Sequence, residues 1–455
     1  MQKILITLSF LMLAVSLGAH SAGATIHAQG PKDPVEALQA TISHQQAVLA
    51  APGYRKNLYE WARLNLRLGE ARYRLALLTK NPDLLEQAVK NFDATLTVWT
   101  KKSKPQAWAV IEFDRGSALT MLGGARHRMD DLTKAVAAFQ AALEILSRKP
   151  HSYSYGMTER MLAQALLEEA GIEHSPASLE ASIAAAKAAA ETWQATNNQR
   201  ELILAQFVLG KIYYLKGMLT KNRDDIRKAA DIQRSVLAAK DPKQEPEQAA
   251  EWAATFGDEM RDLGMHDHNL AELDDAARAY RSAIAIWTKP TDDLARSKVQ
   301  SLLGSVLIRQ AVWNNRPEML YDAISTYESA LAHWPAQMER DQWASAEAGH
   351  GDALAELGRI YRLPARFLAA NDAYRTALTV WSPGHLPDAY SVANRHLGAS
   401  FMYLAISTHK PDYAQQGIDA YKAALSVKND AKNEAEIQGL IVRAEAQLKR
   451  LQAKR

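Results

Sequence analysis

The sequence predicts an all-α solenoid of about eight helix-turn-helix repeats, and two observations carry this prediction. The 455-residue chain aligns with itself in steps of 47 residues without an insertion. Self-similarity at a period of roughly 20–50 residues is typical of stacked repeat proteins. One column of the alignment is glycine in all copies but one: Gly69, Gly116, Ala163, Gly210, Gly257, Gly304, Gly351 and Gly398. A second column, 19 residues later, is small throughout: Ala88, Ala135, Ser182, Ala229, Ala276, Ala323, Ala370 and Gly417.

Each repeat is expected to be a helical hairpin. In the second copy, residues 104–150, apolar side chains recur at helical spacing in two stretches, and Gly123-Gly124 interrupts the pattern between them. Spacings of three and four residues place the apolar side chains on one stripe of each helix. Two helices of roughly 15–18 residues with short connections account for one period. Proline-containing breaks such as Asn81-Pro82 and Ser175-Pro176 supply the start signals of second helices.

The columns have a packing logic. Glycine inside a helix costs about 1 kcal/mol relative to alanine, so its repetition indicates that a neighbouring helix passes too close for a Cβ. Four residues after the small column an aromatic recurs: Phe92, Phe139, Tyr280, Tyr327, Tyr374 and Tyr421. Ala186 and Gln233 replace it in the third and fourth copies, where we expect looser packing.

These residues resemble a tetratricopeptide repeat. The spacing of alanine, aromatic and alanine, as in Ala135, Phe139 and Ala142, is that of the family, and the longer step from glycine to alanine implies elongated helices. The resemblance, to elongated bacterial arrays of this type, covers about residues 33–429 and implies a right-handed superhelix. HEAT and armadillo repeats share the period, but the glycine and alanine–aromatic–alanine columns favour the tetratricopeptide type.

The chain is expected to have four parts. Residues 1–24 resemble a secretory signal peptide, with Lys3, an apolar stretch too short to span a bilayer, and the small-residue cleavage site Ala22-Gly23-Ala24. An uncleaved anchor is the less favoured reading. Residues 25–52 form a linker and a capping helix, 53–430 the eight repeats, and 431–455 a second capping helix with a basic tail. We therefore expect an exported protein, periplasmic or secreted, with no membrane span after cleavage.

Composition and motifs argue against nucleic-acid binding and give no indication of a catalytic or metal site. The net charge is +3 with both signs interspersed, whereas nucleic-acid binders concentrate positive charge on one face. The chain has no cysteine, hence no disulfide. The sequence 265–269 is the sole local cluster of metal-ligand residues, and we interpret it as a solvated loop. We find no catalytic motif and expect no enzyme activity, no catalytic residues, no metal site and no cofactor.

Aromatic residues give one alternative. Trp99, Trp193, Trp287, Trp334 and Trp381 share a column at the end of the second helix. Packing between repeats is the favoured interpretation, and a stacking platform for sugars the other.

The resemblance implies that the first helices line the concave face of the array. The groove-lining residues that it indicates are Glu70, Tyr73, Thr120, Gln164, Lys211, Tyr214, Ser305, Asp352 and Met402. We therefore expect a non-catalytic scaffold that binds a peptide or helix segment of a partner protein along the groove. A cell-envelope glycan-binding module and an accessory subunit of an enzyme complex are the alternatives.

Overall fold

The computed structural model describes residues 33–51, 53–146, 151–239, 244–335, 337–428 and 430–453. The predicted signal peptide, residues 1–24, lies outside them. The described residues form helices without a strand, and the chain divides into two compact units, residues 1–241 and 242–455. The predicted all-α solenoid of helix-turn-helix repeats is confirmed.

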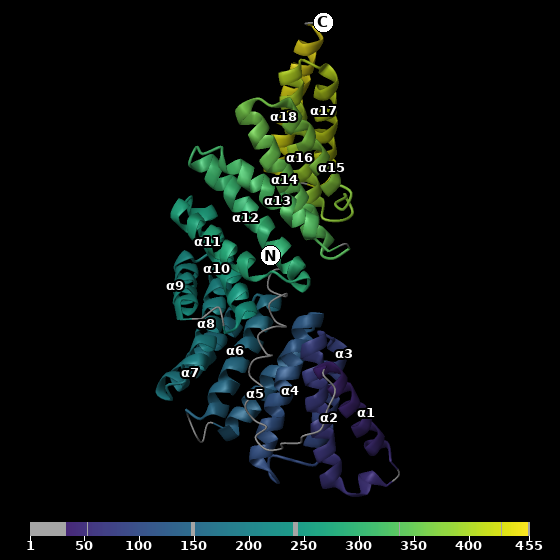
Figure 1. The fold of residues 1–455 in the computed structure, drawn as a ribbon, viewed down its shortest axis with the longest axis vertical. Helices are drawn as coiled ribbons and strands as arrows, with labels where there is room; N and C mark the ends of the chain where they lie inside the picture. The colour runs from purple at the N-terminus through teal and green to yellow at the C-terminus, as the bar shows by residue number, and fades with distance from the viewer. Residues whose placement is uncertain are drawn as a thin grey trace. The chain divides into compact units, whose positions relative to one another are not determined.

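The N-terminal unit consists of one leading helix followed by four hairpins (Figure 1). Its helices are α1 (Pro34–Ala50), α2 (Leu58–Thr79), α3 (Pro82–Leu96), α4 (Pro105–Arg126), α5 (Met129–Leu146), α6 (Tyr153–Glu173), α7 (Pro176–Ala195), α8 (Gln199–Thr220) and α9 (Arg223–Ala239), with a 3₁₀ turn η2 (Tyr54–Lys56). By length and composition α8 could cross a membrane, but 56% of its most apolar window is buried within the structure, and α8 packs between α7 and α9. Its apolar length therefore serves the core of this unit.

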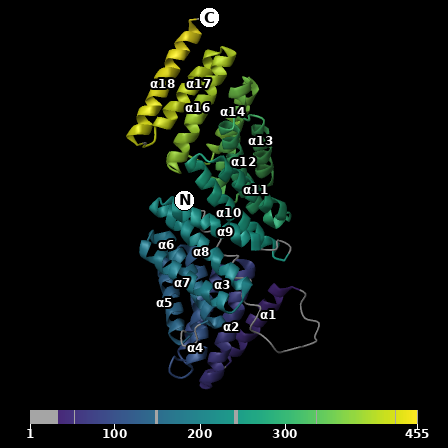
Figure 2. The ribbon, with the colours of Figure 1, turned by 90° about the vertical axis from the view of Figure 1, so that its left-hand side faces the viewer.

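The C-terminal unit consists of four hairpins and a closing helix. Its helices are α10 (Pro246–Asp267), α11 (Leu270–Ile286), α12 (Asp293–Trp313), α13 (Met319–His333), α14 (Arg340–Tyr361), α15 (Pro364–Ala377), α16 (Pro387–Thr408), α17 (Pro411–Leu425) and α18 (Ala431–Gln452), with a 3₁₀ turn η3 (Pro290–Asp292). In Figure 2, α16, α17 and α18 lie side by side, and α17 contacts both neighbours. The exposed side of α18 carries Arg443, Lys449 and Arg450, while Ile437, Ala444 and Leu451 are buried.

The expected helix lengths were wrong for the first helix of each hairpin, which has 21 or 22 residues. Gly123 and Gly124 do not end α4, which continues to Arg126 with both glycines buried. A Cβ at Gly123 would lie 2.7 Å from Leu132 Cγ of α5. The glycine therefore makes room for the second helix instead of breaking the first.

The glycine column has a more specific cause than a closely passing helix. A Cβ at Gly116 would lie 2.9 Å from the ring of Phe139, and one at Gly304 would lie 2.5 Å from the ring of Tyr327. In six of the eight repeats the aromatic of the second helix covers the glycine of the first, and in the fourth repeat Gln233 covers Gly210 instead. The third repeat supports this pairing, because Ala163 replaces the glycine in the copy where Ala186 replaces the aromatic.

The first helix of each hairpin ends in a left-handed residue, 11 positions after the glycine column. These residues have φ between 51° and 56°: Lys80, His127, His174, Lys221, His268, Asn315, Arg362 and His409. Most are basic, and a cation there complements the negative end of the helix dipole. The histidines of these turns are thus explained by helix termination.

Candidate functional site

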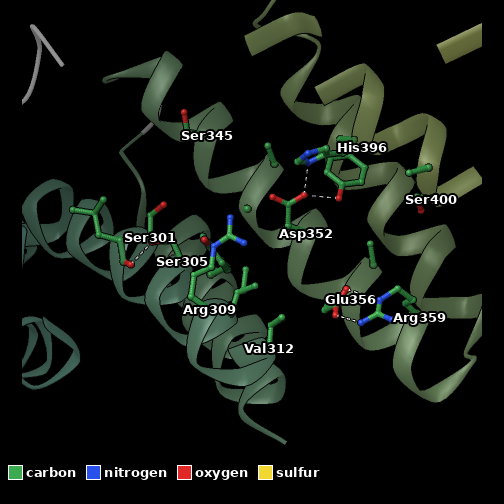
Figure 3. Close-up of a pocket in the computed structure, with 18 of the residues that line it drawn as sticks. Ser301, Ser305, Arg309, Val312, Ser345, Asp352, Glu356, Arg359, His396 and Ser400 are labelled. Carbon is green, nitrogen blue, oxygen red and sulfur yellow. Dashed lines mark hydrogen bonds and ion pairs between the residues drawn. The ribbon is translucent and has the colours of Figure 1, made fainter. Parts of the chain in front are cut away.

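The C-terminal unit contains an open groove of about 830 Å³, lined mainly by the first helices α12, α14 and α16 (Figure 3). Serine hydroxyls, charged groups and apolar side chains all contribute to its wall. Most of the lining residues occupy four positions of the repeat. One lies three residues before the column glycine, and the others lie one, four and five residues after it. These positions are Ser301, Ser305, Ile308 and Arg309 on α12, Ala348, Asp352, Ala355 and Glu356 on α14, and Ala399 and Tyr403 on α16.

Small side chains explain why this surface is hollow. Three residues before the glycine column, the C-terminal unit has Ala254, Ser301 and Ala348 in its first three hairpins and Arg395, which does not line the groove, in the fourth. The N-terminal unit has large residues at the equivalent positions: Leu66, Phe113, Arg160 and Phe207. Large side chains on facing helices fill the space between them. The groove therefore coincides with a change of residue size in one column.

Asp352 is the centre of a hydrogen-bonded cluster that joins three helices. Its Oδ1 accepts hydrogen bonds from the hydroxyl of Tyr374 on α15 and from Nδ1 of His396 on α16, each at 2.7 Å (Figure 3). Burial disfavours the charged imidazole, but the hydrogen bond and negative charge of Asp352 outweigh it and raise the pKa of His396. Burial, followed by the charge of Asp352, also raises the pKa of Tyr374 well above its ordinary value.

The same tyrosine–aspartate pair recurs in the fifth repeat. The Tyr280 hydroxyl donates to Asp258 Oδ1 at 2.6 Å, and Arg261 Nη1 donates to the same oxygen at 3.0 Å. Burial raises the pKa of Asp258, although Arg261 and Tyr280 act against it. In both repeats, a tyrosine crosses beneath the glycine and holds the carboxylate that follows it.

The wall beyond Asp352 combines one ion pair with apolar side chains. Glu356 and Arg359 form an ion pair on α14, with Arg359 Nε donating to Oε2 at 2.9 Å. Tyr403 is 46% exposed and stacks on Phe367, with ring centroids 5.6 Å apart. Its remaining face and the exposed Val312 give this part of the groove an apolar character.

The predicted groove residues separate according to the unit in which they lie. Ser305 and Asp352 line the groove. Met402 faces the α17 side, where its Sδ would lie 3.0 Å from a Cβ at Gly417, and the next residue, Tyr403, lines the groove in its place. In the N-terminal unit the side chains are buried or half-buried: Tyr73, Thr120, Gln164 and Lys211 are buried, and Glu70 and Tyr214 are half-buried.

Sequence reasoning did not single out Ser301, Arg309, Ala348, Glu356 or His396. The signal was present in the alignment at the positions three before and five after the glycine. Reading those two columns for size and charge, in addition to the positions that the family resemblance implied, would have found four of the five. His396 is in a column that otherwise varies without pattern.

A buried polar cluster occupies the equivalent face of the N-terminal unit. Arg160 Nη2 lies 3.7 Å from Glu201 Oε2, and both side chains are almost completely buried. Burial and then the negative charge of Glu70 raise the pKa of Asp114 to about 8. Burial, with Asp114 adding to it, raises the pKa of Tyr73, whose hydroxyl has no hydrogen-bond partner among the described residues. The cluster lies within the N-terminal unit.

The metal-ligand segment and the tryptophan column contribute one residue each, Met265 and Trp381, to the groove lining. No group of three or more His, Asp or Glu residues in the described part of the chain could hold a metal ion. Within the segment 265–269, His268 stacks on Trp313 at 4.7 Å. The five tryptophans of the column are each at most 9% exposed. Their low exposure agrees with the favoured interpretation, packing between elements, and Trp381 contributes to the groove lining as well.

No protein-family model matches the chain, and no curated protein matches it. Among solved structures it is similar to the apo form of the quorum sensor NprR from B. thuringiensis, at 14% identity and a TM-score of 0.44, covering 87% of this chain and 100% of that one. It is also similar to Rap protein complexed with Competence and Sporulation Factor, at 12% identity and a TM-score of 0.37, covering 92% and 100%. The TPR domain of P58(IPK) is a third, at 16% identity and a TM-score of 0.24, covering 87% and 99%. The predicted resemblance to tetratricopeptide repeats is confirmed for the fold: the chain consists of repeated helix pairs of this type.

Proposed function

We propose that the protein is an exported, non-catalytic scaffold that docks a peptide segment of a partner protein in the α12–α14–α16 groove. The observation that carries the proposal is the groove itself, an open surface on the first helices with both apolar and polar walls. Binding sites combine apolar area with a few positioned polar groups, and this wall has both. The sugar-binding alternative loses its main support because the tryptophan column is buried.

Filling the groove tests the docking proposal. Ser301→Phe and Ala348→Phe place on α12 and α14 the side chain that Phe113 and Phe207 have at the same register in the N-terminal unit. The matched control is Ser282→Phe, at an exposed position of α11 outside the groove. The probe is a random library of short peptides with both ends blocked, whose retention on the immobilised full chain is read by sequencing.

We expect the wild type and Ser282→Phe to retain the same set of peptides and both groove variants to lose it by tenfold or more. The helical circular dichroism and the urea transition of each variant show that it is folded. Peptide retention unaffected by either groove variant would overturn the proposal. Binding to a glycan panel in the absence of peptide binding would favour the sugar-binding alternative.

Export is tested separately. Residues 1–24 are fused to a reporter enzyme that is active only outside the bacterial cytoplasm, and mass spectrometry of the mature full chain identifies its first residue. We expect an active reporter and a new N-terminus near Ala24. An inactive reporter, or a mature chain that begins at Met1, would contradict export with cleavage.

A further inference from the structure

The groove has an uneven charge balance. Asp352 is bound by His396 and Tyr374, and Glu356 is paired with Arg359. Each carboxylate on the wall therefore has a donor from the chain itself. The remaining charged side chain of the lining is Arg309.

Arg309 lies in the middle of the α12 wall and is exposed. Figure 3 shows its guanidinium directed into the space between α12 and α14, with no ion pair to the other residues drawn. Among the described residues no carboxylate oxygen lies within 4.0 Å of it, whereas Arg261, Arg359 and His396 of the same unit each have one. A guanidinium binds a carboxylate through two parallel N–H donors.

The surroundings of Arg309 are apolar and hydroxylic. Ser305 and Val312 lie four and three residues away on the same helix, Ile308 is the preceding residue, and all three line the groove. The Ser305 hydroxyl already donates to the Leu302 carbonyl at 2.7 Å. An anion that reached Arg309 would thus meet one strong donor between apolar side chains.

We propose that Arg309 anchors an acidic side chain of the docked segment, so that the groove selects segments with Asp or Glu flanked by apolar residues. This inference rests on the proposed docking function. The proposed ligand is the carboxylate of an internal Asp or Glu side chain and not that of a chain terminus. Arg309 is the one unpaired cation of the described lining, and a single guanidinium matches a single side-chain carboxylate. A basic segment would bring a second cation to Arg309 and is disfavoured.

The test uses the blocked-peptide library on the full chain with three variants. Arg309→Gln removes the charge, Arg309→Glu reverses it, and Arg316→Gln removes an exposed arginine outside the groove lining. Individual acidic peptides recovered with the wild type are then measured by fluorescence polarisation at low and high salt.

We expect acidic residues to be enriched in peptides that the wild type and Arg316→Gln retain. Arg309→Gln should abolish the enrichment and weaken a recovered acidic peptide roughly tenfold or more, and Arg309→Glu should shift the retained set to basic peptides. High salt should weaken the acidic peptides, because a partly exposed ion pair is screened.

Two outcomes would overturn the inference. One is a wild-type set without acidic enrichment, and the other is an enrichment that survives in Arg309→Gln. If either occurs while Ser301→Phe still removes the retained peptides, the docking function stands and this inference alone fails. If Ser301→Phe and Ala348→Phe leave retention unchanged, the docking function itself has failed.

Discussion

The two units follow one 47-residue register but differ in how the first-helix positions next to the glycine column are packed. In the N-terminal unit these side chains are buried or half-buried, and burial disfavours the charged forms of Asp114 and Tyr73. In the C-terminal unit the equivalent surface is open, and Asp352 is held by His396 and Tyr374. The repeat sets the direction of each side chain. Residue size three positions before the glycine then separates the filled surface at Phe113 and Phe207 from the open groove at Ser301 and Ala348.

The largest effect is expected at a glycine–aromatic pair. Tyr327→Ala should destabilise the chain by about 3–5 kcal/mol through the cavity that it leaves. Gly304→Ala should cost about 1–3 kcal/mol, because its Cβ would lie 2.5 Å from the Tyr327 ring. The double variant should cost less than the sum, since its pair matches Ala163 and Ala186 of the N-terminal unit.

A double-mutant cycle measured by urea unfolding of the full chain gives the coupling. Strictly additive costs would show that the two positions do not act as a pair. The glycine column would then need another cause.

Two buried asparagines, one in each unit, should respond with opposite signs. Asn371 is 1% exposed, and neither atom of its amide has a hydrogen-bond partner among the described residues. The same column elsewhere is apolar: Val89, Val136, Ile183, Ala230, Ala277, Ile324 and Ile418. Asn371→Ile should therefore stabilise the chain, by about 1–3 kcal/mol.

The matched control is Asn91 of the N-terminal unit, which accepts a hydrogen bond from Arg72 and donates to Asn65 at 2.9 Å. Asn91→Leu should cost about 1–3 kcal/mol, because it leaves both partners buried without it. Thermal or urea unfolding measures both variants. Destabilisation by both would mean that Asn371 has a use that its surroundings do not reveal.

Asp114→Asn should stabilise the N-terminal unit by about 1–2 kcal/mol near neutral pH. Burial, followed by Glu70, raises the pKa of the Asp114 carboxyl from 3.8 to about 8. The folded state therefore holds a proton that the unfolded state releases, and stability falls as pH rises from about 4 to 8. The advantage of the variant should grow over that range, as urea unfolding at several pH values would show. An advantage independent of pH would contradict the assignment.

Features that are determined within one repeat could be predicted from the sequence, whereas features that depend on a neighbouring helix or on the other unit could not. The hairpins and their columns follow from apolar periodicity, which is written into each repeat. The reason for Gly304 could not be read from its own helix, because the ring that covers it belongs to the next helix. A groove on the first helices was predicted, but its location on α12, α14 and α16 was not. That location depends on the difference between Phe113 and Ser301, two residues at the same register in different units.

The smallest effect is expected at His396, which is partly exposed. Asp352 raises its pKa above the ordinary 6.5 against the effect of burial, while Arg395 and Arg309 act to lower it. Its contribution to stability is thus fully present below about pH 6.5 and is lost as pH rises through the folded-state pKa. His396→Gln should destabilise the C-terminal unit at pH 5–6 and lose its effect at pH 9.

His350 is the matched control, because burial lowers its pKa and Asp352 is not its partner. His350→Gln should lack the loss of effect with rising pH. An NMR titration of the His396 ring that gives a pKa below 6.5 would contradict the ion pair with Asp352.

The pairing of a glycine with an aromatic ring in six of the repeats also constrains how the copies can differ from one another. A single substitution at either position leaves a clash or a cavity, whereas the third repeat carries Ala163 and Ala186 together and is folded. The fourth repeat changes one member only: it keeps Gly210, and the long side chain of Gln233 covers it in place of a ring. The effect of a substitution at one of these positions therefore depends on which residue stands at the other position of the same repeat.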